Sequence, residues 1–133
     1  MKLTARSEYA LLALIYLARN QSTGYVPIET IASVQNIPAK FLEQIMLALK
    51  NAHYLHSSKG LHGGYRLAKA ADSISLAEVI RLFNGALAPT HSASRYFYES
   101  TPIEKESRLV CIFRELRDLV SDRLEHTTIA DVC

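Results

Sequence analysis

Hydrophobic residues recur at helical spacing along most of this chain. Near the start they cover almost every face of the predicted helix, at Leu11, Leu12, Leu14, Ile15 and Leu17. A helix that is apolar nearly all round is buried in a core. Either Thr4 or Ser7 can cap its first turn, and residues 20–24 end it.

Two shorter helices joined by a tight turn are predicted next. Pro27 opens the first, over residues 28–34, and Pro38 lies in the first turn of the second, which runs to about Asn51. Between them, Asn36 tolerates the left-handed conformation that a tight turn requires. The second helix carries an apolar stripe, Phe41, Leu42, Ile45, Met46 and Leu49, opposite a face with Lys40, Glu43, Gln44, Leu47 and Asn51. This pattern is typical of a helix-turn-helix.

A β-hairpin is predicted directly after these helices. Residues 54–58 and 65–67 have the pattern of two short strands. The segment 59–64 between them contains three glycines, which permit positive φ angles and a close approach of the backbone to a ligand. A hairpin that follows a helix-turn-helix is the wing of a winged helix.

The second half of the chain is predicted to hold two helices and a loop. Ser75 and Glu78 form a capping box that starts a helix over residues 76–83. After a loop, a long helix runs to about His126, and Thr127 or Thr128 caps a final turn. The long helix carries an apolar seam, Leu109, Ile112, Phe113, Leu116, Leu119 and Val120. Such a seam packs in the core of its own protomer or forms an interface with a partner, and the sequence does not separate the two.

The composition narrows the class of protein. Hydrophobic residues make up 49% of the 133 residues, enough to bury a core. The longest apolar run, residues 9–18, is too short to span a bilayer, and no signal-peptide cleavage site follows it. We therefore expect a cytoplasmic protein that makes no membrane contact. The cysteines Cys111 and Cys133 do not make a disulfide framework.

The charge is unevenly distributed along the chain. Residues 1–68 carry seven Lys or Arg against three acidic residues, and residues 69–133 carry eight against ten. A basic N-terminal half favours a polyanionic partner. Taken alone, the same imbalance is equally consistent with ordinary surface charge.

The polar face of the helix after Pro38 suits the recognition of base edges. Gln44 can pair with adenine, Lys40 can reach guanine or a phosphate, and Glu43 can accept a hydrogen bond from cytosine. The alternative is a solvated polar face. The turn before this helix and the wing after it favour DNA binding, because together they present the face to a groove. We predict DNA contacts from Thr4, Arg6, Pro38, Lys40, Phe41, Glu43, Gln44, Lys59, Gly60 and His62.

The predicted fold class is mainly α with a small β-hairpin wing: a winged helix-turn-helix plus a long C-terminal helix, which is a dimerisation helix if its seam faces a partner. We expect a DNA-binding domain over residues 1–84, a connecting or sensor loop over 85–103, and the dimerisation helix with a C-terminal turn over 104–133. A homodimer is favoured because one winged helix contacts few bases, whereas two halves spaced one turn apart on a palindromic operator gain affinity and specificity.

Other functions find less support in the sequence. No Gly-Lys-Ser/Thr motif or catalytic set is present, so we expect no enzyme. His53, His56 and His62 lack a Cys or acid that would complete a metal site. Cys111 is predicted to be buried and inert because of its apolar neighbours. A winged helix that binds a protein rather than DNA is the alternative function.

The chain resembles the Rrf2 family of bacterial winged-helix regulators over nearly its whole length. The matching stretches are residues 1–4, 7–10, 31–32, 37–38, 41–46, 59–67, 74–80 and 128–132. The resemblance implies a homodimeric transcriptional regulator, acting as a repressor and held together by the long helix. It also implies that the helix from Pro38 enters the major groove and that the wing touches the minor groove. Lys40, Phe41, Glu43 and Gln44 fall on the family's base-facing segment, and Lys59 on its wing contact.

The chain departs from the family's cluster-binding members in one respect. Those members carry three cysteines in the loop before the long helix, whereas residues 88–107 contain none. We therefore expect no iron–sulfur cluster and no other cofactor, although a two-iron cluster held by Glu8 and Cys111 of different protomers is an alternative. The signal, a small molecule or a partner protein, is expected to act on the loop, where Tyr96, Phe97 and Tyr98 pack as core or line a pocket, packing being favoured.

Overall fold

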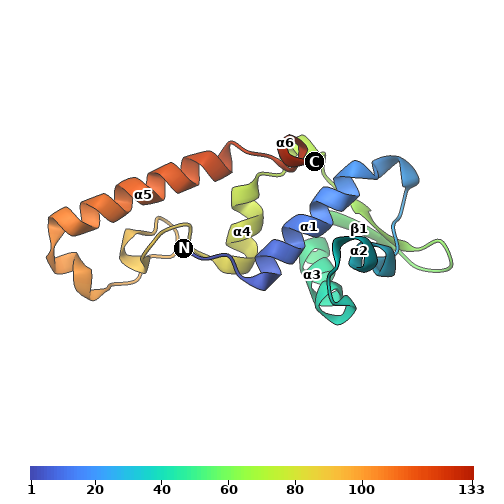
Figure 1. Ribbon diagram of the computed structural model, residues 1–133, viewed down its shortest axis with the longest axis horizontal. Coiled ribbons are helices and arrows are strands. Elements are labelled where there is room, and N and C mark those ends of the chain that lie inside the picture. Colours follow the sequence, from blue (N-terminus) through green and yellow to red (C-terminus); the bar gives the residue numbers. More distant parts are fainter.

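The computed structural model describes residues 1–133 and has a winged helix at one end and a long helix at the other (Figure 1). Its elements are α1 (Ala5–Arg19), α2 (Ile28–Gln35), α3 (Ala39–Asn51), β1 (Leu55–Ser58), β2 (Gly64–Leu67), α4 (Leu76–Asn84), α5 (Ser107–Glu125) and α6 (Ile129–Val132). Short 3₁₀ turns occupy Gln21–Thr23, Ala71–Ser73, His91–Ala93 and Pro102–Lys105. This mainly helical fold with one antiparallel hairpin confirms the predicted fold class.

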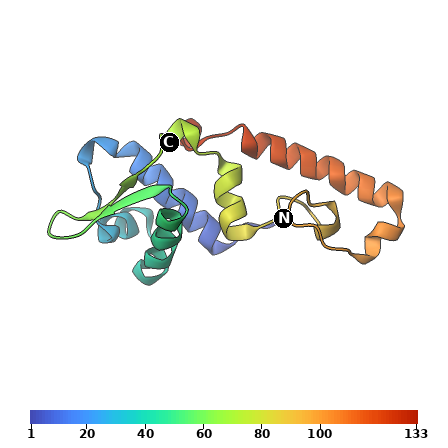
Figure 2. The same ribbon diagram turned by 180° about the vertical axis from the view of Figure 1, so that it is seen from behind.

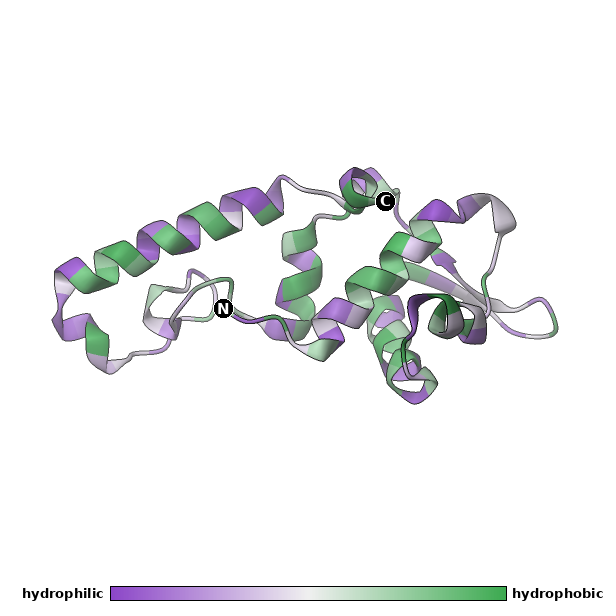
Figure 3. Cartoon of the chain, in the orientation of Figure 1, coloured by the Kyte–Doolittle hydropathy of each residue, from purple (hydrophilic) through white to green (hydrophobic).

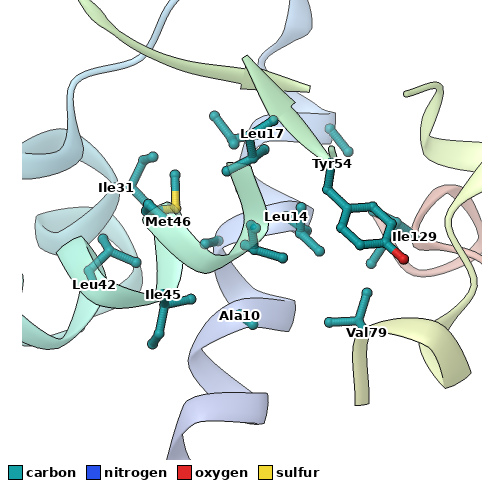
Figure 4. Packing of buried hydrophobic residues seen from close by; sticks show 14 of the residues in the cluster. Ala10, Leu14, Leu17, Ile31, Leu42, Ile45, Met46, Tyr54, Val79 and Ile129 are labelled. Carbon is teal, nitrogen blue, oxygen red and sulfur yellow. The ribbon is translucent and has the colours of Figure 1, made fainter. Parts of the chain in front are cut away.

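The core lies where α1 crosses α3, and it extends to the first strand and α4 (Figure 4). Leu14 of α1 and Ile45 and Met46 of α3 are completely buried there. The predicted apolar stripe of this helix is wrong at Phe41, because this side chain is 51% exposed and lies outside the buried face. It precedes Leu42 by one residue, and the turn of about 100° between neighbouring helical positions moves it to the margin of the buried face.

The turn between α2 and α3 has the predicted geometry. Asn36 adopts φ 57° and ψ 48°, in the left-handed region, and its backbone N–H donates to the carbonyl of Ala32. Gln35 donates from Nε2 to the Leu12 carbonyl at 2.8 Å, which fixes the end of α2 against α1. The helix-turn-helix is therefore held by side-chain and backbone bonds as well as by its apolar core.

The wing, residues 55–67, is tied to the start of α2. Its strands pair in register from Leu55 with Leu67 to Ser58 with Gly64. On the other edge of β2, Val26 and Tyr65 exchange two backbone hydrogen bonds, of 2.8 and 2.9 Å. Because Pro27 caps α2 immediately after Val26, this bridge sets the position of the wing relative to the helix-turn-helix.

The chain returns to the winged helix at its end. Thr128 caps α6 with a capping box completed by Asp131, and the Ile129 N–H donates to the Ile74 carbonyl at 2.9 Å. Ile129 is completely buried in the main core cluster. The predicted domain boundary at residue 104 stays a prediction. α6, which lies after that boundary, packs with the N-terminal half of the chain.

α5 lies apart from α1–α3 and is joined to the body by α4 and the preceding loop (Figure 2). Val110 and Ser121 are buried on its inner side. Arg81 of α4 forms an ion pair with Glu125 at 2.6 Å, and Arg117 donates to the Ala93 carbonyl at 2.8 Å. These two contacts fix the C-terminal half of α5 to the rest of the protomer.

Two predictions for this region are wrong. Cys111 is exposed rather than buried, because the inner side of α5 is formed by Val110 and Ser121 and not by residue 111. The favoured core packing of Tyr96, Phe97 and Tyr98 is wrong as well, because all three side chains are exposed. Tyr96 and Phe97 instead line a small hollow, which was the other alternative. Small residues fill the space between the loop and α5 instead, with Ser92, Ala93 and Ser94 buried there.

Candidate nucleic-acid interface

The outward face of α3 presents a run of side chains that no other part of the chain covers. Lys40, Glu43 and Gln44 are all exposed, and Leu47 extends the same surface by one turn. The opposite side of the helix is anchored by Leu42, Ile45, Met46 and Leu49, which are completely buried. The helix is therefore fixed in the body while its polar side faces outward.

Three of the predicted DNA contacts converge at the start of α3. Lys40, Phe41 and Gln44 line one shallow hollow of about 150 Å³. The Phe41 ring meets Tyr9 of α1 edge to face, with centroids 6.4 Å apart. This contact holds the exposed Phe41 ring beside the Gln44 amide and the Lys40 ammonium group.

The wing ends in a five-residue tip, residues 59–63, on which Lys59, Gly60 and His62 are exposed. Gly60 has φ +100° and accepts a hydrogen bond at its carbonyl from the Gly63 N–H at 3.0 Å. A Cβ on Gly63 would lie 2.4 Å from the Ser58 carbonyl oxygen, so no other residue fits that position without a shift of the backbone. The glycines thus build a tight turn that carries the predicted contacts.

Thr4 and Arg6 are engaged within the chain. Thr4 caps α1 by accepting from the Ser7 N–H at 3.2 Å, and its own N–H donates to Asn84 Oδ1. The Arg6 guanidinium stacks over the Phe83 ring at 5.6 Å. The structure therefore places these two predicted contacts at the junction of α1 with α4, apart from the hollow on α3.

α3 and the wing lie on the side of the molecule away from α5 (Figures 1 and 2). Sequence reasoning missed two features of this side. Leu61 at the wing tip is almost fully exposed, and Arg66 of β2 stacks on the Tyr25 ring at 4.8 Å. The glycines that flank the tip are a sequence signal for Leu61, because a turn of glycines offers no side chains to cover it.

The seam on α5 is only partly covered by its own protomer. Leu109, Ile112, Leu116 and Leu119 are exposed, while Phe113 and Val120 are half-buried. Figure 3 shows hydrophobic positions repeating along α5 between hydrophilic ones. The structure therefore does not bury this face in the protomer's own core.

The whole chain aligns with known regulators that have the same architecture. Residues 3–133 match the Rrf2 family, described as iron-dependent transcriptional regulators. The chain belongs to the Rrf2 family. The regulator IscR of Erwinia tasmaniensis is 30% identical, over 99% of this chain and 78% of its own length. CymR of Bacillus subtilis is 29% identical, over 99% of this chain and 89% of its own length.

A solved structure of CymR, the global cysteine regulator of B. subtilis, superposes with a TM-score of 0.78 at 28% identity, covering 99% of this chain and 95% of that one. As an Rrf2 member with this fold, the chain is a DNA-binding helix-turn-helix transcriptional regulator and not an enzyme, as the sequence predicted. No helix combines the length and the apolar character needed to cross a membrane.

The family is described as iron-dependent, so we asked whether the residues of one protomer could hold an iron–sulfur cluster. Iron–sulfur clusters are held by Cys thiolates, with His as an occasional replacement. The two thiols are both exposed, Cys111 on α5 and Cys133 just after α6. No three His, Cys, Asp or Glu side chains gather where a metal ion would be held. The residues of a single protomer therefore do not fit a cluster.

Proposed function

We propose that this Rrf2 regulator binds a palindromic operator as a homodimer in the cytoplasm and represses transcription from the promoter that contains it. α3 enters the major groove and the wing reaches the adjacent minor groove. The observation that carries this proposal is the hollow shared by Lys40, Phe41 and Gln44 on the exposed side of a helix whose other side is completely buried.

Each exposed group on α3 has a matching base edge. The Gln44 amide can donate to adenine N7 and accept from the adenine 6-amino group. No other base offers this pair of groups in the major groove. Lys40 suits the O6 and N7 acceptors of guanine, and Phe41 suits the thymine methyl. Lys59 on the wing contributes a phosphate contact, which adds affinity without sequence information.

Dimerisation through α5 follows from its exposed seam. Four large apolar side chains on one face of a helix would stay in water unless a second copy covered them. An apolar groove of about 360 Å³, lined in part by Leu119, Val120 and Leu124, lies beside the seam and offers a place for side chains of the partner. A two-fold axis through α5 would pair two α3 helices for a palindromic site.

The connecting segment, residues 85–103, is where a signal would act on this dimer. It leaves α4 at Gly85 and packs on α5 through Ala93, so a change in its conformation alters the angle between the winged helix and α5. Tyr96 and Tyr98 are exposed on it and are accessible to a small molecule or partner protein. Replacing both with Ala should abolish a response to that signal and leave operator affinity without the signal unchanged.

The proposal is tested by selecting bound duplexes from a random-sequence pool with the wild-type protein. Gln44→Ala should weaken binding to the selected duplex by about 1–3 kcal/mol and leave binding to a scrambled duplex unaffected. Lys59→Ala should weaken both duplexes alike. Gln21→Ala, which replaces an exposed glutamine in the 3₁₀ turn after α1, is the matched control. Equal losses on both duplexes for Gln44→Ala would show that Gln44 does not read bases.

A further inference from the structure

The most exposed large hydrophobic side chain of the protein stands at the wing tip. Leu61 has 93% of its surface accessible, well above the next such residue. Isolated exposed leucines are common on protein surfaces, so exposure alone carries no meaning. The position of Leu61 is informative, because Lys59 and His62 are exposed on either side of it within one turn.

The backbone holds Leu61 in this position. The Gly63 N–H to Gly60 carbonyl bond closes the turn, and Gly63 packs against the Ser58 carbonyl too closely for any Cβ. At the end of β2 next to the tip, a Cβ on Gly64 would meet the Val26 carbonyl oxygen at 2.2 Å. The tip is thus built on close backbone contacts to a strand that is itself bridged to the start of α2. Leu61 is presented at the end of a constrained arm and does not lie back on the body.

An apolar side chain flanked by two donor-bearing side chains suits the minor groove of A·T-rich DNA. The floor of that groove carries only the N3 and O2 acceptors at A·T pairs, and G·C pairs add the guanine 2-amino group. An apolar group that reaches the floor collides with this amino group and leaves its N–H without a partner. The narrower A·T groove also attracts cations, which Lys59 supplies.

We propose that Leu61 enters the minor groove and acts as the protein's steric reader for A·T pairs under the wing. This inference rests on the proposed function, since it requires the wing to lie on DNA. It assigns the wing a share in sequence recognition, whereas a lysine on a phosphate would give affinity alone. Apolar side chains are used in this way by proteins that wedge the minor groove.

The test changes the minor-groove edge and leaves the pairing partners and the major-groove edges unchanged. In the duplex selected by the wild-type protein, adenines at the two flanks protected by the wing are replaced by 2,6-diaminopurine, which adds the 2-amino group. Wild-type affinity should fall about tenfold, corresponding to one good base contact. Replacing a flanking G·C pair with inosine·C, which removes that amino group, should raise it.

Leu61→Ala should reduce the diaminopurine penalty to less than about twofold, because the shorter side chain does not reach the added amino group. Folding is not at risk, since Leu61 contacts solvent almost everywhere. Leu82→Ala, the same substitution at an exposed position of α4, should keep the full penalty. An undiminished penalty in Leu61→Ala would overturn the role of Leu61 while leaving DNA binding intact. Failure of the wild-type protein to enrich any sequence would instead overturn the proposed function, and this inference with it.

Discussion

The side chain of Asn84, at the end of α4, accepts a hydrogen bond from the buried hydroxyl of Ser7 on α1 at 2.7 Å. The same Oδ1 accepts from the Thr4 N–H, and Nδ2 donates to the Lys2 carbonyl. One amide therefore joins the N-terminal segment, α1 and α4. Gly85 follows at once and starts the segment that leads to α5, so this amide fixes where that segment leaves the winged helix.

Asn84→Ala should lower the free energy of unfolding by about 1–3 kcal/mol, because it removes three hydrogen bonds and takes an acceptor from a completely buried hydroxyl. Urea denaturation at neutral pH measures the loss. Asn51→Ala, at an exposed position of α3, should change the value by less than about 0.5 kcal/mol. Equal effects in the two variants would mean that water replaces the Asn84 amide without cost.

A second stability prediction concerns the turn of the helix-turn-helix. Asn36 has a positive φ, which a Cβ-bearing residue other than Asn or Asp adopts at a cost of about 1 kcal/mol. Asn36→Ala should be destabilising by that amount, and Asn36→Gly should be close to neutral because glycine adopts this conformation freely. Thermal unfolding of the two variants provides the comparison. A glycine variant as unstable as the alanine one would assign the effect to the lost side chain and not to the backbone.

Much of the fold could be predicted from short-range signals in the sequence. The capping box at Ser75 and the left-handed turn at Asn36 depend on neighbouring residues, and the structure confirms both. Of the two caps predicted for the final turn, Thr127 or Thr128, the structure uses Thr128. Errors arose where burial depends on distant segments. Cys111 has apolar neighbours in sequence, but only the side of α5 that meets the loop is covered.

The candidate site shows the same division between local and distant information. The hollow of Lys40, Phe41 and Gln44 lies within one helical turn, so its residues could be named from periodicity. The link between Asn84 and Ser7 spans 77 positions, and no local pattern predicts it. Leu61 belongs with the local signals, because the glycines beside it mark the turn that exposes it and Gly63 packs against Ser58 within the same turn.

The pH dependence of stability should have a contribution from Glu78. Burial acts to raise the pKa of this carboxyl, but hydrogen bonds from Tyr54 and Ser75 and the nearby Lys69 outweigh it and hold the pKa below its usual value. Burial and the neighbouring carboxylate raise the pKa of Tyr54, so its hydroxyl keeps its proton and remains a donor. A carboxyl whose pKa is lowered by folding stabilises the folded state above its unfolded pKa, and this stabilisation is lost as the pH falls through the folded value.

Glu78→Gln should therefore be less stable than the wild-type protein at pH 7, and the difference should shrink as the pH falls from about 5 toward the folded pKa. Urea titrations at several pH values measure it. Glu43→Gln replaces an exposed carboxylate on α3 and serves as the matched substitution. The same pH-dependent difference in both variants would attribute the effect to net charge and not to the Tyr54 and Ser75 contacts.

The seam on α5 yields a prediction that separates folding from assembly. Leu119 is 68% exposed in the protomer, so Leu119→Asp places a charge in water in the monomer and in an apolar interface in the dimer. The variant should fold with an unchanged circular dichroism spectrum and sediment as a monomer. Each protomer would bring one unpaired charge into the interface at a cost of about 3 kcal/mol, so the dimer dissociation constant should rise by more than about a hundredfold. Cys111→Asp adds the same charge on another face of α5 and should leave the dimer intact. If Leu119→Asp sediments as a dimer, the partner does not cover this part of the seam, and the interface lies elsewhere on the molecule.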